Sequence, residues 1–206
     1  MNHKEEELKR LFIAAGEKLA ELNLVCAGSG NLSMRLDEKT VLITATGSEL
    51  GGLKPGDIVK TDLSGRPCGK AKKLPSSELP IHLMIYNKFP VAAITHCHPP
   101  LTNAYFSVMP ELKALTFESR FYLKDVPVIR QRGVNVTDPA LVIKALKKSN
   151  LVVLRNHGVF SIGESFSRDL NPVLILEEAV KVCALARIFK KGSLDRVDRE
   201  IKKYLL

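Results

Sequence analysis

Apolar residues recur every three or four positions in several stretches, which is the spacing of an amphipathic helix. The first stretch, residues 5–23, carries its apolar face on Leu8, Leu11, Phe12, Ala15, Leu19 and Leu22. Asp138-Pro139 supplies a capping residue and a proline at the first helical position of another stretch. The pattern predicts further helices over 80–86, 101–107, 138–148, 172–190 and 193–206.

Short runs rich in β-branched residues lie between these helices and are typical of strands. Residues 32–36 and 41–44, joined by the turn Asp37-Glu38-Lys39, predict a hairpin. Residues 109–126 show no regular period, so we expect them to be irregular. We expect one domain over 1–206, since the 206 residues contain no repeat and no linker. The other predicted strands cover 58–62, 91–94, 128–130, 151–154 and 159–162.

The strand that begins at Val91 runs into a pair of histidines. On a strand, residues two apart point to the same face, so His96 and His98 project together while Cys97 points away. Two imidazoles on one face suit zinc, and His157 follows far downstream. Three histidines with an open fourth position are typical of catalytic zinc. The spacing of the pair alone fits equally a chance arrangement on a half-buried strand.

Composition limits the class of protein. The chain is 45% hydrophobic and 26% charged, as in ordinary soluble proteins. No apolar run approaches the roughly 18 residues of a membrane span. Residues 1–10 are charged and have no signal-peptide core, so we expect a cytoplasmic protein that has no membrane partner and keeps its four cysteines as thiols.

The net charge is +9, from 31 basic and 22 acidic residues. Such a charge is compatible with nucleic-acid binding, but no nucleic-acid motif is present and aromatic residues are only 6%. We interpret the charge as a diffuse field that attracts phosphorylated metabolites, with no nucleic-acid partner.

Three small polar segments predict anion-binding positions. The turns at 28–31 and 46–48 offer backbone N–H groups beside hydroxyl or amide side chains. Ser76 and Ser77 precede a helical pattern, where a helix N-terminus favours phosphate. Each turn alone also fits a simple connection. Glu78, in the first turn, is either a partner of the helix dipole or a catalytic carboxylate, and His82 is interpreted as a hydrogen-bonded helix residue.

Five motifs in a fixed order over about residues 5–190 resemble the class II aldolase/adducin family. They are Gly28-Ser-Gly-Asn-Leu-Ser-Met-Arg35, Ile43-Thr-Ala-Thr-Gly47, Lys73-Leu-Pro-Ser-Ser-Glu78, His96-Cys-His98 and Asn156-His-Gly158. The resemblance implies one three-layer α/β/α domain with a mostly antiparallel central sheet. It also implies a homotetramer with the active site at a subunit boundary.

The same resemblance implies a role for each matching residue. His96, His98 and His157 would hold one Zn²⁺ per subunit. Glu78 would be the acid/base and would touch the metal when substrate is absent. The substrate phosphate would lie among Asn31, Thr46, Gly47, Ser76 and Ser77.

The implied activity is that of a zinc-dependent aldolase. It would reversibly cleave a ketose 1-phosphate, similar to L-fuculose 1-phosphate, to dihydroxyacetone phosphate and a small aldehyde. Three alternatives within the family stay open: a methylthioribulose-1-phosphate dehydratase, a pentulose-5-phosphate 4-epimerase and an adducin-like binding domain without activity. The three histidines and Glu78 favour an enzyme. At the aldehyde end the family uses a tyrosine where this chain has Phe117, which leaves Glu118, Tyr122 and Tyr204 as candidates.

Overall fold

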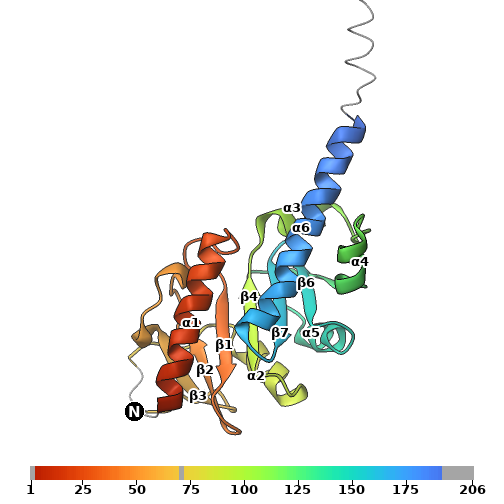
Figure 1. Ribbon diagram of the computed structural model, residues 1–206. Helices are drawn as coiled ribbons and strands as arrows, with labels where there is room; N and C mark the ends of the chain where they lie inside the picture. Colours follow the sequence, from red (N-terminus) through yellow and green to blue (C-terminus); the bar gives the residue numbers. More distant parts are fainter. Residues whose placement is uncertain (1–2, 70–71, 192–206) are drawn as a thin grey trace, which may run out of the picture.

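The centre of the computed structural model, which describes residues 3–69 and 72–191, is one seven-stranded sheet (Figure 1). The strand order is β3-β2-β1-β4-β7-β6-β5. Neighbouring strands are antiparallel except β5 and β6, which are parallel. The strands are β1 (Asn31–Arg35), β2 (Thr40–Thr44), β3 (Ile58–Asp62), β4 (Ala93–Cys97), β5 (Val128–Arg130), β6 (Leu151–Arg155) and β7 (Gly158–Gly163).

Helices cover both faces of this sheet. On one face lie α1 (His3–Glu21), α3 (Pro100–Val108) and α6 (Phe166–Lys191), and α4 (Phe117–Leu123) packs on α6. On the other face lie α2 (Leu79–Lys88) and α5 (Pro139–Leu146). Two single 3₁₀ turns, η1 (Leu50–Gly52) and η2 (Pro55–Asp57), connect β2 to β3. The predicted three-layer α/β/α architecture with a mostly antiparallel sheet is therefore confirmed.

The alternation of side chains along the strands divides the core in two. In β6, Leu151 and Val153 join the cluster under α1 and α6, whereas Val152 and Leu154 join the cluster under α2 and α5. Strand β4 divides in the same way, with Cys97 in the first cluster and Ile94 in the second. His96 is two residues from Ile94, so its ring lies on the α2 face, and Cys97 points away from it as the spacing predicted.

The register of the three central strands brings the polar residues of the site together. Asn31 of β1 pairs with His96 of β4, and His96 pairs in turn with Phe160 of β7. The β6–β7 turn then places His157, because Asn156 adopts the left-handed conformation (φ 63°) that a tight hairpin requires. The His157 N–H donates to the Leu154 carbonyl at 3.0 Å, which closes the turn.

Two elements differ from the prediction. Residues 109–126 are not wholly irregular, because Thr116 caps α4 by accepting a hydrogen bond from the Ser119 N–H. Only Ser119 and Leu123 of α4 are buried, so the helix has too few apolar positions to show a period. Helix α6 begins at Phe166, six residues before the predicted start, and contains Pro172. The predicted helix over 193–206 lies outside the described residues.

Candidate metal and substrate site

Three histidine side chains converge at the end of β4. The Nε2 atom of His96 lies 3.0 Å from Nε2 of His98 and 3.0 Å from Nε2 of His157. His96 is 1% exposed, and its ring stacks on Phe160 with ring centroids 4.3 Å apart. The predicted ligands, 61 residues apart in the chain, therefore point their nitrogens at one position.

Gly158 makes this convergence possible. A side chain there would collide with the Cys97 carbonyl, and its Cβ would lie 2.7 Å from Cδ2 of His98 and 3.2 Å from Cε1 of His96. Because only glycine fits, the β7 backbone approaches the histidine pair closely enough for His157 to join it. The Asn103 amide also donates to the His157 carbonyl at 3.2 Å, which fixes the turn to α3.

The hydrogen bonds define which ring nitrogens are free for a metal. Nδ1 of His96 lies 2.9 Å from the Val159 carbonyl, which can only accept, so Nδ1 carries the proton. Nε2 of His96 then carries no proton, and its lone pair faces Nε2 of His98 and Nε2 of His157. An outer hydrogen bond to a backbone carbonyl is how metal-bound histidines are commonly oriented. This donor set fits a divalent cation such as Zn²⁺.

Glu78 closes the site from the helix layer that covers this face of the sheet. It precedes α2 and is 7% exposed, with Oε2 3.2 Å from Nε2 of His96. Oε1 is buried 3.6 Å from Nε2 of His157 and finds no hydrogen-bond partner among the described residues. An unsatisfied buried carboxylate oxygen beside three imidazoles is a strong second sign that a cation or substrate group belongs here.

Burial controls the charge state of these side chains. It lowers the pKa of His96 well below the usual range, lowers that of His98 to about 4 and also lowers that of His157, so all three imidazoles are neutral. Neutral imidazole is the form that binds metal. Burial also raises the pKa of Glu78, and the hydrogen bond from Asn31 offsets part of that rise.

The predicted anion-binding segments lie next to one another. A side chain at Gly28 would contact Gly47, so the turns at 28–31 and 46–48 are adjacent. The backbone pairs Ala45 with Pro75, which brings the Ser76 segment beside the second turn. Ser48 Oγ is buried and has no partner within the described part of the chain. Three loops that are distant in sequence thus lie side by side.

The serines before α2 act differently from the prediction. Neither is the N-cap, because Glu78 occupies that position and α2 begins at Leu79. The Ser76 hydroxyl instead accepts the Glu78 N–H at 3.2 Å, and the Leu79 N–H bonds the Ser76 carbonyl. Ser76 is 8% exposed, whereas the Ser77 side chain is open to solvent. Ser76 therefore fixes the backbone that presents Glu78.

The candidates for the aldehyde end are separate from this cluster in the fold. Glu118 and Tyr122 lie on α4, where Tyr122 is 60% exposed and Phe117 is 89% exposed. Tyr204 lies outside the described residues. The structure does not bring Glu118 or Tyr122 into hydrogen-bond contact with the histidines or Glu78, so the role of all three candidates stays a prediction.

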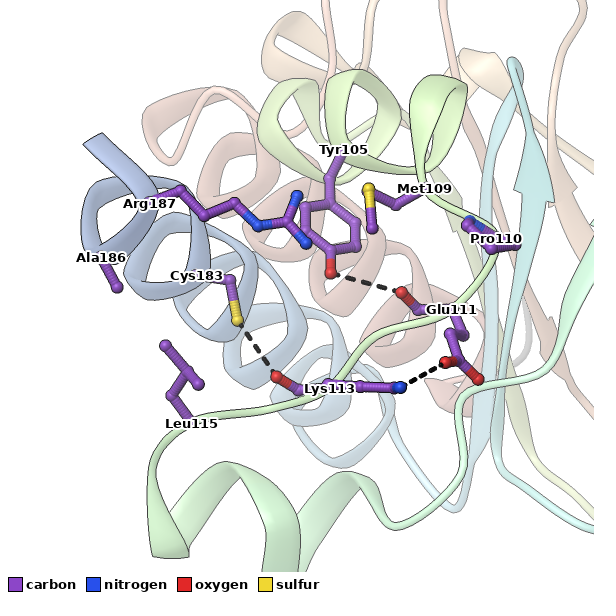
Figure 2. A pocket seen from close by; sticks show the side chains of 9 residues that line it. All are labelled: Tyr105, Met109, Pro110, Glu111, Lys113, Leu115, Cys183, Ala186 and Arg187. Atoms are coloured by element: carbon purple, nitrogen blue, oxygen red, sulfur yellow. Dashed lines mark hydrogen bonds and ion pairs between the residues drawn. The ribbon is translucent and has the colours of Figure 1, made fainter. Parts of the chain in front are cut away.

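A cavity of about 500 Å³ elsewhere, between α3, α6 and the segment after α3, is lined by other residues (Figure 2). Its polar groups are bonded to each other: the Tyr105 hydroxyl donates to the Glu111 carbonyl, and the Cys183 thiol donates to the Lys113 carbonyl. Arg187 lies over the Tyr105 ring. None of the three histidines or Glu78 lines this cavity, so we place the candidate site at the histidine cluster.

A buried carboxylate beside three neutral imidazoles, on a three-layer α/β/α sandwich, defines a metal-dependent enzyme class. The profile of the family described as Class II Aldolase and Adducin N-terminal domain matches residues 10–184. The chain belongs to this family, as its motifs predicted, and the prediction of a metal-dependent lyase is confirmed.

Individual relatives agree with the family and differ in activity. The chain is 32% identical over 184 residues to an L-fuculose phosphate aldolase of Methanocaldococcus jannaschii, which covers 89% of this chain and 99% of that protein. It is 28% identical to a methylthioribulose-1-phosphate dehydratase of Xanthomonas campestris pv. campestris, over 78% of this chain and 81% of that protein. The solved L-fuculose-1-phosphate aldolase of Thermus thermophilus superposes with a TM-score of 0.79 at 28% identity, covering 92% and 99% of the two chains.

One further structural finding concerns membranes. Among the helices within 3–69 and 72–191, none combines the length and apolar character needed to cross a bilayer.

Proposed function

We propose that the chain is a zinc-dependent aldolase that reversibly cleaves a ketose 1-phosphate to dihydroxyacetone phosphate and a small aldehyde. The observation that carries this proposal is the meeting of three Nε2 atoms with Oε1 of Glu78, which has no partner among the described residues. The 32% identical L-fuculose phosphate aldolase supports a substrate of the L-fuculose 1-phosphate type.

Each part of the site has a distinct task in this reaction. Zn²⁺ bound by the three histidines would supply a Lewis acid for negative charge that develops on the substrate's oxygens. When the C–C bond breaks, its electron pair stays on the dihydroxyacetone phosphate half. Glu78 then gives a proton to that carbon, or removes it in the condensation direction. The hydroxyl proton of the aldehyde half leaves to a group at the other end, for which Glu118, Tyr122 and Tyr204 stay candidates.

We propose that Asn31, Thr46, Gly47, Ser76 and Ser77 bind the substrate phosphate. The adjacency of their loops supports this proposal, as does the buried hydroxyl of Ser48, which lacks a partner among the described residues. Replacing Ser76 and Ser77 together by alanine should raise KM for a phosphorylated substrate about tenfold, the loss of roughly one charge-assisted hydrogen bond. It should also lower kcat, because the Ser76 hydroxyl accepts the Glu78 N–H. Ser167→Ala, an exposed position on α6, is the control. An unchanged KM would refute this phosphate site.

The central test is hydrogen exchange at the hydroxymethyl carbon of dihydroxyacetone phosphate in deuterated water, followed by NMR. This half-reaction needs no knowledge of the aldehyde. We expect zinc-dependent exchange that disappears in Glu78→Gln while bound zinc is retained. His96→Ala should lose zinc and exchange together, because it removes the nitrogen that faces both other histidines.

Matched controls exist for both variants. Glu49→Gln changes an exposed carboxylate with no capping hydrogen bond, and His3→Ala changes an exposed histidine of α1. Both should exchange at the wild-type rate. Normal turnover by Glu78→Gln would refute its role as acid/base. A zinc-loaded protein without exchange would favour the dehydratase, which the 28% identical relative represents, or the epimerase. No zinc and no exchange would favour a binding domain.

We also propose a homotetramer with the site at a subunit boundary. Exposed apolar side chains lie on α4, just before it and on the last turns of α6, which supports a contact between copies: Leu115, Phe117, Phe121, Tyr122, Ile188 and Phe189. Light scattering should give four subunits for the wild type and fewer for Phe117→Ser combined with Phe121→Ser. A monomeric wild type would contradict the proposal.

A further inference from the structure

A line of buried polar side chains leads away from Glu78 between β1 and α2. The Asn31 amide nitrogen lies 2.8 Å from Oε2 of Glu78, and its Oδ1 lies 2.6 Å from Nε2 of His82. On the other side of that ring, Nδ1 of His82 lies 2.6 Å from the Ser33 hydroxyl. The line ends at the Tyr86 hydroxyl, 2.9 Å from Ser33 Oγ.

The line results from the regular spacing of polar residues on α2 and on β1. Glu78, His82 and Tyr86 are spaced by four residues, so they stack along one face of α2. Asn31 and Ser33 are spaced by two on β1 and project from its same face. His82 and Ser33 have no exposed surface, and Tyr86 is 4% exposed. Water therefore cannot substitute for a missing partner without rearrangement.

The chemistry of these groups determines which one donates and which one accepts in each hydrogen bond of the line. An ionised Glu78 can only accept, so the Asn31 group that faces it is the amide nitrogen. Oδ1 of Asn31 must then accept, which places the His82 proton on Nε2. Burial lowers the pKa of His82 to about 3, so the ring is neutral and its Nδ1 is an acceptor. The Ser33 hydroxyl donates to Nδ1 and accepts from Tyr86.

We propose that His82 and Tyr86 are positioning residues that hold the Asn31 amide as a donor to Oε2 of Glu78, so that Oε1 is the oxygen that transfers the proton. Every donor in the line points toward Glu78. Oε2 is thereby occupied by the amide, while Oε1 is left without a protein partner in the described part of the chain. The kinetic part of this inference rests on the proposed function, whereas the direction of the hydrogen bonds does not.

The line also assigns Asn31 a task different from phosphate binding alone. Its Oδ1 is used by His82 and one amide proton is used by Glu78. Only the second amide proton is left for a substrate. A defect at His82 should therefore act mainly on proton transfer, which lowers kcat, and much less on KM.

The direct test is the protonation of His82 in the intact protein, read by long-range ¹H–¹⁵N NMR of histidine-labelled enzyme. Loss of one ring signal in His82→Gln assigns the resonance. We expect a neutral ring with its proton on Nε2. A proton on Nδ1 alone would reverse the direction of the line and overturn the proposal, whatever the activity.

The second test compares His82→Gln with His82→Met. Glutamine can place an amide donor near the position of Nε2, whereas methionine fills similar space without a donor. We expect exchange into dihydroxyacetone phosphate to stay within about threefold in His82→Gln. In His82→Met, kcat for this exchange should fall about 10- to 100-fold, as is typical when an outer partner of a metal site is lost. Zinc content and KM should not change.

Three results would contradict the proposal: equal rates in the two variants, a loss confined to KM, or zinc loss in His82→Met alone. The Asn31 side-chain NH₂ signals give a readout without activity, since methionine should shift them and glutamine should not. If the wild type shows no exchange while His82 carries its proton on Nε2 and these signals respond as expected, the proposed function fails and the positioning of Asn31 stands.

Discussion

Asp169 is a buried acid outside the histidine cluster, and Asp169→Asn should make the fold more stable at alkaline pH. The side chain has no exposed surface. The Thr95 hydroxyl donates to its Oδ1 at 3.0 Å, while Oδ2 is buried without a partner among the described residues. Burial raises the pKa of this carboxyl from 3.8 to about 8, and the bond from Thr95 opposes that rise. Asparagine keeps the acceptor for Thr95 and cannot ionise.

The direction in which stability changes with pH follows from proton binding to Asp169. Between pH 3.8 and about 8 the folded protein holds a proton on Asp169 that the unfolded chain has released, so stability falls as pH rises through this window. Each pH unit inside this window lowers the free energy of unfolding by about 1.4 kcal/mol. Because the window ends at the folded pKa of about 8, the loss of stability between pH 5 and pH 9 amounts to about 4 kcal/mol. Asp169 lies in the first turn of α6, whose positive end favours the carboxylate by up to about 2 kcal/mol. We therefore expect the advantage of Asp169→Asn to grow by about 2–4 kcal/mol from pH 5 to pH 9.

Urea unfolding measures this difference. The chain has no tryptophan, so far-UV circular dichroism is the signal, at one protein concentration and with a chelator present. The buried histidines make stability rise with pH, because folding lowers the pKa of His82 to about 3 and of His98 to about 4. Their contribution is common to both proteins and cancels in the comparison. A difference that stays constant from pH 5 to pH 9 would show that Asp169 is ionised throughout and would refute the reasoning.

Three other substitutions test how the site and its frame are held. Gly158→Ala should reduce zinc affinity at least about tenfold in a competition titration, because the new Cβ would collide with the Cys97 carbonyl and crowd the ligands. Gly16→Ala should destabilise the fold by about 1–3 kcal/mol in urea, since α1 meets the Leu50 carbonyl at that position. Glu177→Ala should cost about 1–3 kcal/mol and lower Tm, because its carboxylate accepts the first free N–H groups of α3. Unchanged zinc affinity or unchanged unfolding midpoints would contradict these assignments.

Much of the fold could be predicted because burial follows sequence period. The alternation in Leu151–Leu154 reports directly which side chains face each core. The helical spacing in α1 correctly marks Phe12 and Leu19 as buried, although Leu11 and Leu22 of the same predicted face are exposed. The helix α4 and the first turns of α6 could not be predicted, because they depend on contacts outside their own sequence. The formation of α4 depends on the Thr116 cap and on packing against α6, and the first turns of α6 depend on Phe166 and Leu170 meeting α1 and the sheet. Neither contact is visible in a local window of sequence.

The meeting of His96 and His98 could be predicted because their two-residue spacing fixes a shared face. The positioning residues could not, since the partnership of Ser33 with His82 spans 49 positions and depends on how α2 lies across β1. A signal was nevertheless present: Glu78, His82 and Tyr86 recur every four residues, and the other residues from Leu79 to Ile85 are apolar. Three polar groups in one row, buried against a sheet, require partners, and the partners are found on the strand they cross.

The buried centre of the fold and its exposed elements differ in how freely their residues can change. Glu78 and the three histidines are positioned by the central strands, their connecting turn and the start of α2, where register and burial leave little freedom: Asn31 opposes His96, and His96 opposes Phe160. Two of the candidates for the aldehyde end lie on α4, which is short and largely exposed. A change on α4 costs little packing, whereas a change beside His96 disturbs both cores. Relatives that carry the names aldolase and dehydratase are consistent with such a division, because exposed elements tolerate substitution more easily than a buried centre does.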